Sequence, residues 1–213
     1  FHAYGLELLR KYGGAIGFTR PPKLLDRTDS LMLLEELLPK LGLHHYLNLI
    51  DPVLPLKPLL GAIGRAKDER VSPERYAELA RAMRDAATTE DAEEDADKAI
   101  EVARVYSMYD QTLRERGLVD FGDLVALPAA MLRDDAETRE AVRAERPHVL
   151  VDEYQDMNFA SSQLLKQIVR PGRGPWVVGD VRQAIYRFRG ASPLNMTRFF
   201  DDFPGSAVTD LSL

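Results

Sequence analysis

The sequence contains no cysteine. This absence excludes disulfide bonds and thiolate metal sites, and it is typical of proteins in a reducing compartment, so we expect a cytoplasmic location. No apolar stretch approaches the length that a membrane span needs, and we expect no membrane partner. Residues 1–4 lack the basic start and apolar segment of a secretory signal. The first residue is Phe1 rather than methionine, from which we expect the chain to begin inside a longer protein.

An excess of basic residues is also missing. The formal net charge is −6 over 213 residues, so bulk charge gives no support to nucleic-acid binding. The distribution is uneven, because residues 85–97 hold seven acids and no base, whereas residues 163–200 hold seven bases and one acid. A DNA-binding face, if the protein has one, is therefore expected in the last quarter of the chain.

Hydrophobic periodicity predicts a helical first half and an α/β second half. Prolines between residues 43 and 60 predict only short helical turns there, and Asp29 or Ser30 is expected to cap the second helix. The acidic residues 88–97 form either a loop or the first turn of the following helix. The expected helices span 1–12, 30–41, 72–87, 96–116, 138–144, 158–169 and 192–203, and the expected strands span 148–151, 176–178 and 207–211. A turn that begins at residue 118 is expected to lead into a further helix that reaches residue 132.

Two of these apolar runs end in acids. Asp152 and Glu153 follow the first, and Asp180 follows the second, with Gln183 just beyond. Buried parallel strands that end in carboxylates place them at the sheet edge where ligands bind. There one carboxylate can hold Mg²⁺, the next can orient or deprotonate a water, and an amide can bridge a γ-phosphate and that water. The alternative is that Asp152 and Glu153 only favour the N-terminus of the next helix.

Aromatic and arginine side chains alternate directly after Gln183, at Tyr186, Arg187, Phe188 and Arg189. A single strand of nucleic acid needs this composition, with rings that stack on bases and guanidiniums that contact phosphates. The alternative is that the rings belong to a core and the arginines to a solvated face. Next to a nucleotide site, the first interpretation couples ATP chemistry to a strand contact.

Two long segments carry a family resemblance. Residues 151–158 (VDEYQDMN) and 178–191 (VGDVRQAIYRFRGA) resemble motifs II and III of superfamily 1 DNA helicases of the UvrD/Rep/PcrA type, in the same order and spacing. Weaker resemblances lie at residues 1–4 (FHAY), at 119–124 (VDFGDL), which is similar to an Asp-Phe-x-Asp-Leu segment, and at 210–213 (DLSL).

The resemblance implies a role for each matching residue. Asp152 would hold Mg²⁺, Glu153 would be the catalytic base, and Gln183, with Asp180, would contact the nucleotide. The residues that would meet single-stranded DNA are Phe1, His2, Tyr186, Phe188 and Arg189.

The implied fold is α/β, a partial RecA-like parallel sheet with flanking helices and a mostly α-helical inserted subdomain. Residues 1–12 and 118–213 would belong to the RecA-like core, and 13–117 to the insertion. The implied activity is ATP- and Mg²⁺-dependent 3′→5′ movement on single-stranded DNA with unwinding at duplex junctions. The partners would be the remaining helicase domains and proteins of DNA repair or recombination.

The sequence also departs from the family pattern. No G-x-x-x-x-G-K-[ST] segment occurs in the 213 residues, so the loop that would cradle the phosphates is absent, and the fragment is expected to be inactive by itself. Val181 and Arg182 stand in place of a more acidic pair, which is closer to RecB- or AddA-like helicase–nuclease subunits. A non-catalytic DNA-binding module and a metal nuclease site formed by Asp152, Glu153 and Asp180 are further alternatives.

Overall fold

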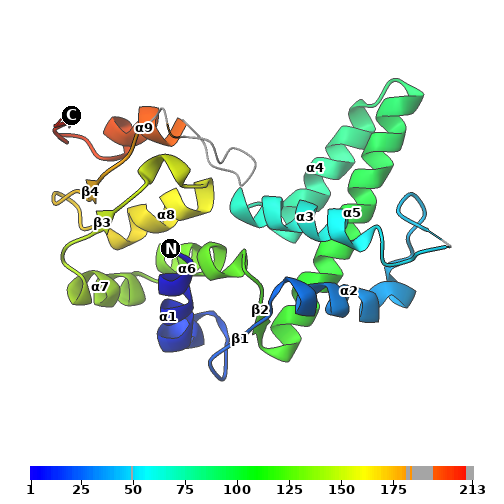
Figure 1. The fold of residues 1–213 in the computed structure, drawn as a ribbon, viewed down its shortest axis with the longest axis horizontal. Helices are drawn as coiled ribbons and strands as arrows, with labels where there is room; N and C mark the ends of the chain where they lie inside the picture. The colour runs from blue at the N-terminus through cyan, green and yellow to red at the C-terminus, as the bar shows by residue number, and fades with distance from the viewer. Residues whose placement is uncertain (49, 181–182, 184–193, 210–213) are drawn as a thin grey trace. The chain divides into compact units, whose positions relative to one another are not determined.

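A computed structural model describes residues 1–48, 50–180, 183 and 194–209 (Figure 1). The chain forms two compact units, residues 1–125 and 126–213. Most described residues are helical, and the strands are short parallel pairs. The helices are α1 (His2–Tyr12), α2 (Arg27–Leu41), α3 (Leu56–Asp68), α4 (Pro73–Ala86), α5 (Glu90–Arg116), α6 (Asp123–Asp134), α7 (Ala136–Glu145), α8 (Phe159–Ile168) and α9 (Leu194–Asp202). The strands are β1 (Lys23–Leu24), β2 (Leu118–Val119), β3 (Leu150–Val151) and β4 (Trp176–Val177).

The first unit is built around α5. Figure 1 shows α4 and α5 side by side as a hairpin. Thr89 caps α5 by accepting a hydrogen bond from the Ala92 amide, and acids fill its first turn, where the helix dipole favours them. The acidic segment is therefore mostly helical, the second of the two expected alternatives. Leucines of α2 and α3 pack against the buried face of α5 and form the core of this unit with Tyr106 and Tyr109.

Glu101 fixes the loop that follows α2. Its carboxylate is buried and accepts hydrogen bonds from the backbone amides of His44, His45 and Tyr46 at 2.7, 3.0 and 3.2 Å. Three donors satisfy the charge that burial would otherwise penalise. The two imidazoles remain exposed, so these histidines act through their backbone.

A buried ion cluster joins α3 to the start of α6. The Lys67 ammonium lies 2.7 Å from Asp120 Oδ2 and 2.8 Å from Asp123 Oδ1, and all three side chains are buried. Burial opposes the charge of Lys67, but the two carboxylates outweigh it and raise the Lys67 pKa. Burial raises the pKa of Asp123, and the charge of Lys67 opposes that shift.

Three expectations about the first unit are corrected. The N-cap of α2 is Asp26, which forms a reciprocal capping box with Asp29, so the helix begins earlier than its leucine repeat indicates. Proline does not limit the chain to short turns, because α3 begins at Leu56 with Pro58 in its first turn, where a missing amide costs little. The expected helical first half also contains a strand, because β1 pairs in parallel with β2.

The second unit contains the parallel pair of β3 and β4, in which Leu150 is opposite Trp176 and Val151 is opposite Val177. The pair is covered on one face only among the described residues, because Val151 is buried whereas Leu150 and Trp176 are 78% and 79% exposed. The predicted strands exist, but they are not buried on both faces as parallel strands usually are. The expected third strand is not found at residues 207–209, and residues 210–211 lie outside the described part of the chain.

Both units are thus mostly helical and each contains one small parallel strand pair, which is consistent with an α/β helicase domain. The finer assignments, a RecA-like core and an insertion bounded at residues 13 and 117, remain predictions.

Candidate functional site

The predicted acids lie at one edge of the second unit's sheet. Asp152 and Glu153 directly follow β3, and Asp180 lies three residues after β4 ends. Because the two strands are parallel, their carboxyl ends meet at the same edge. All three carboxylates are exposed, so solvent reaches them.

Gln155 connects the two strand ends. Its side chain is buried, its Nε2 donates to Glu153 Oε2 at 2.5 Å, and its Oε1 accepts from the Asp180 amide at 3.0 Å. The Tyr154 amide also donates to the Val178 carbonyl at 2.9 Å. One amide group therefore holds the orientation of Glu153 relative to the end of β4. The sequence analysis assigned no role to Gln155. The available signal was its position two residues after Glu153, in the segment that directly follows β3.

Gly179 makes this connection possible. A Cβ atom there would lie 2.8 Å from Gln155 Oε1 and 3.3 Å from Tyr154 Cβ. The first of these contacts is shorter than real Cβ atoms show, so a side chain at this position would displace the Gln155 amide that accepts from the Asp180 amide. Glycine is required here for close approach rather than for an unusual dihedral angle.

Glu153 has a left-handed backbone, with φ 51° and ψ 46°. This conformation costs a non-glycine residue about 1–3 kcal/mol and is concentrated at functional sites. The Asp152 carboxylate accepts a hydrogen bond from the Glu153 amide at 3.0 Å, which helps to hold the turn. The sharp turn keeps Asp152 and Glu153 exposed while Tyr154 and Gln155 enter the core.

Tyr154 anchors the turn through its buried side chain. Its ring meets that of Phe199 edge to face, with centroids 5.3 Å apart. Burial, and to a smaller extent the charge of Asp202, raises the pKa of Tyr154 to about 12. The phenol of Tyr154 therefore stays neutral at physiological pH, and its side chain contributes packing to the core next to Glu153.

Gln183 is close to Asp180. Its Nε2 donates to Asp180 Oδ2 at 3.1 Å, and its backbone amide donates to the Asp180 carbonyl at 3.0 Å. The structure thus brings together Asp152, Glu153, Asp180 and Gln183 through the strand pair and Gln155. Tyr186, Phe188 and Arg189 lie outside the described residues.

Phe1 and His2 belong to the other unit. The His2 ring stacks on that of Phe121 with centroids 3.9 Å apart and planes 17° apart. Burial lowers the pKa of His2 to about 4. At neutral pH this side chain is therefore an uncharged aromatic ring, suited to stacking rather than to pairing with a phosphate.

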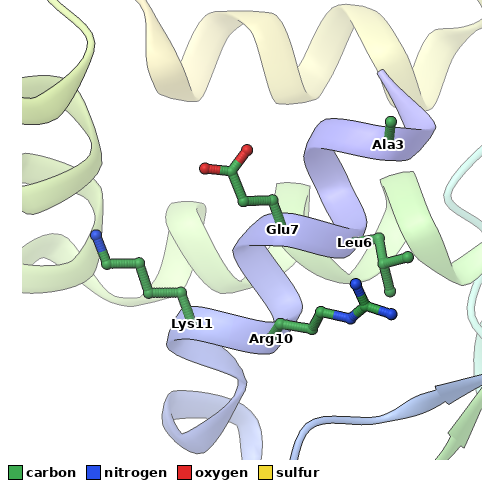
Figure 2. A pocket seen from close by; sticks show the side chains of 5 residues that line it. All are labelled: Ala3, Leu6, Glu7, Arg10 and Lys11. Carbon is green, nitrogen blue, oxygen red and sulfur yellow. The ribbon is translucent and has the colours of Figure 1, made fainter.

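A pocket lies along α1, beyond these two residues. Figure 2 shows Glu7 and Lys11 on one side of the helix and Leu6 and Arg10 on the other, with Ala3 nearer its start. Because the lining holds one acid and two bases, the pocket has no clear preference for an anion. We assign it no role.

The acids at the strand ends fit a magnesium ion by their chemistry. Mg²⁺ binds oxygen, keeps several waters, and often takes only one or two protein carboxylates besides substrate phosphates. Asp152 and Glu153 supply exposed carboxylates of this kind. Within the described ranges, no group of three or more His, Asp or Glu residues forms a metal cage.

The mutation Gln155→Ala is expected to loosen the connection between the strands. It removes one side-chain bond to Glu153 and one to the Asp180 amide, and a net loss of about 1–3 kcal/mol from the second unit is expected. Hydrogen exchange at the Asp180 amide should become faster, as followed by NMR. The control is Gln163→Ala on α8, where the glutamine is only half-buried. Unchanged exchange at Asp180 would contradict the bridging role.

Comparison with known proteins identifies the family. A model of the UvrD/REP helicase N-terminal domain matches residues 1–204. The chain belongs to this family. It is 32% identical to the ATP-dependent DNA helicase Rep of Escherichia coli (strain K12) over 99% of its own length and 28% of Rep. For PcrA of Bacillus subtilis (strain 168), the identity is 30% over 98% of the chain and 25% of PcrA.

UvrD1 of Mycobacterium bovis (strain ATCC BAA-935 / AF2122/97) is 34% identical over 96% of the chain and 25% of UvrD1. The chain thus spans about a quarter of the length of these UvrD/REP relatives. The family match confirms the resemblance drawn from residues 151–158 and 178–191, although the roles of individual residues remain predictions. Among the helices that the structure describes, none combines the length and apolar character that crossing a membrane requires.

Proposed function

We propose that this chain is part of a longer ATP-dependent DNA helicase that couples ATP hydrolysis to 3′→5′ movement on single-stranded DNA and to unwinding at duplex junctions. The observation that carries the proposal is the junction at Gln155, which holds two acid-bearing strand ends together. An ATPase needs this arrangement, because the acid that acts on water and the group that contacts the γ-phosphate must keep a fixed separation.

In this proposal Asp152 holds Mg²⁺, which neutralises developing phosphate charge when it is bound. Glu153 orients the attacking water and accepts its proton, and its exposed carboxylate and fixed backbone support that role. Gln183 contacts the γ-phosphate, and Asp180 holds the Gln183 amide until nucleotide binds. The present bond between Gln183 and Asp180 would be exchanged for one to phosphate.

The DNA contact is assigned to Tyr186, Phe188 and Arg189, which follow Gln183 within six residues, and to Phe1 with His2. Support for the first group comes from residue type and from the names of the relatives, which are DNA helicases. The short sequence distance from Gln183 would let a change at the phosphate reach the strand contact. The remaining helicase domains of the longer protein, and proteins of DNA repair or recombination, are the proposed partners.

The proposal is tested by measuring ATP hydrolysis with and without single-stranded DNA. The longer protein is expected to hydrolyse ATP faster when DNA is present. The 213-residue chain alone is expected to show no turnover, because it has no G-x-x-x-x-G-K-[ST] loop to hold the phosphates. ATP turnover by the chain alone that is abolished by Glu153→Gln would overturn the proposal. Hydrolysis by the longer protein that does not change when DNA is added would also overturn it.

A further inference from the structure

Helix α9 lies between the turn at Glu153 and the segment that the proposed function assigns to DNA. It begins at Leu194, five residues after Arg189, and ends at Asp202. Within the second unit it packs against α8 (Figure 1) and against the single 3-10 turn Tyr154–Asp156. One short helix therefore contacts the segment that follows the proposed base, and it is also the continuation of the chain after the proposed strand contact.

The contact between α9 and the turn is an aromatic pair. The Phe199 ring meets the Tyr154 ring edge to face, with centroids 5.3 Å apart and planes 81° apart, a geometry that aromatic pairs prefer. Tyr154 is only 1% exposed. Its ring is therefore enclosed by close-packed neighbours, and its position depends on where α9 holds Phe199.

The C-terminal end of α9 is fixed to the rest of the second unit. Asp202 Oδ1 lies 2.5 Å from the Lys166 ammonium of α8. The Phe203 side chain is buried and packs on Phe199, with ring centroids 5.3 Å apart. The N-terminal end of the helix is the one that leads to the proposed DNA contact. A change in that contact would reach Phe199 through about one and a half turns of helix.

Glu153 depends on its neighbour because its own backbone is strained. A left-handed conformation (φ 51°) persists at a non-glycine residue only where the surrounding structure holds it. The Tyr154 amide donates to the Val178 carbonyl at 2.9 Å, and the Tyr154 ring packs on Phe199. Both contacts hold the turn. Loss of the ring contact would let Glu153 relax and would move its carboxylate from the position that the proposed mechanism requires.

We propose that Phe199 is a positioning residue for ATP hydrolysis, which holds Glu153 through Tyr154 in the orientation that DNA binding next to α9 favours. This inference rests on the proposed helicase function and adds to it a route from the strand contact to the base. DNA bound at residues 186–189 fixes the N-terminal end of α9, and the population shifts to the state in which Glu153 is correctly placed. Phe199 and Tyr154 touch neither nucleotide nor DNA.

Steady-state ATP turnover by the longer helicase, with and without oligothymidylate, tests the inference. Phe199→Leu keeps an apolar side chain but removes the ring that meets Tyr154. Turnover at saturating DNA is expected to fall about 10- to 100-fold, towards the rate without DNA, because a small displacement of a catalytic group has effects of this order. Turnover without DNA, the KM for ATP and the affinity for DNA should stay as in the parent. Phe200→Leu is the matched control, since Phe200 is on the same helix but 48% exposed.

A general structural role of Phe199 would give a different result. A folded Phe199→Leu variant that loses turnover equally with and without DNA would overturn the inference. If circular dichroism shows that this variant is unfolded, the milder change Phe199→Met takes its place. If DNA stimulates the parent and a folded variant equally, the inference is wrong and the proposed function stands. If DNA does not stimulate the parent, the proposed function fails and the inference fails with it.

A double-mutant cycle tests whether Phe199 acts through Tyr154. Tyr154→Phe keeps the ring and should keep the stimulation by DNA, whereas Tyr154→Leu should lose it as Phe199→Leu does. Because each single change removes the same contact, the double variant Tyr154→Leu, Phe199→Leu should lose no more turnover than either single variant. Losses that multiply would show that the two rings act independently, and this result would overturn the inference.

Discussion

Replacing Glu153 by glutamine in the longer helicase is expected to lower DNA-stimulated ATP hydrolysis about 10²- to 10⁴-fold, the usual contribution of a general base. Glutamine keeps the size of the side chain but cannot accept a proton. In the structure Gln155 binds Oε2 of Glu153, which leaves Oε1 without that constraint and able to face water. Steady-state ATP turnover at saturating DNA measures the effect.

Measuring nucleotide binding distinguishes a variant that has lost catalysis from one that has lost its fold. Glu153→Gln should bind a fluorescent ATP analogue with Mg²⁺ about as well as the parent, whereas Asp152→Asn should weaken the dependence on Mg²⁺. The matched control is Glu140→Gln, which changes an exposed glutamate of α7 in the same unit and should leave turnover unchanged. Turnover that survives Glu153→Gln would mean that another group activates the water.

The mutation Lys67→Met should destabilise the first unit by about 3–5 kcal/mol, because it leaves Asp120 and Asp123 buried without their cation. Without that cation, burial raises the pKa of Asp123 further, so the folded state takes up a proton at higher pH than the unfolded chain. A raised carboxyl pKa gives stability that is present at low pH and is lost as pH rises through the folded pKa. The deficit relative to the parent should thus be larger at pH 8 than at pH 4.

Urea unfolding followed by circular dichroism at several pH values measures this deficit. Lys57→Met, on the same helix but exposed, is the control and should change stability by less than about 0.5 kcal/mol. The triple variant Lys67→Met, Asp120→Asn, Asp123→Asn removes every charge and should recover part of the loss. A pH-independent deficit in Lys67→Met would show that lost packing, rather than unpaired charge, is the cause.

The sequence predicted those elements whose signals are local. Ser72 and Pro73 mark the start of α4, and the structure places the cap at Ser72, whose Oγ accepts from the Arg75 amide at 3.2 Å. The strand–acid pattern likewise predicted that Asp152 and Asp180 meet at one sheet edge. Each of these patterns lies within a few consecutive residues, so it can be recognised without knowing which distant segments it contacts.

Contacts between distant residues could not be read in the same way. Lys67 looks like any lysine of an amphipathic helix until Asp120 and Asp123 are brought to it from more than fifty residues away. Glu101 likewise sits in an ordinary helix, and its backbone partners at residues 44–46 carry no side-chain signal. The stacking of His2 on Phe121 could not be predicted either, because nothing in the sequence near one residue indicates the other.

Helix α5 has a mechanical consequence for this arrangement. It is 27 residues long, or about 40 Å, and it ends at Gly117, next to β2 and the Asp120–Asp123 turn. A tilt of about 5° about that end would move the other end, beside α4, by roughly 3–4 Å while the turn hardly moves. Any tilt of α5 about its C-terminal end would therefore displace the far end of the α4–α5 hairpin much more than the Asp120–Asp123 turn. The packing of α2 and α3 on α5 opposes such a tilt.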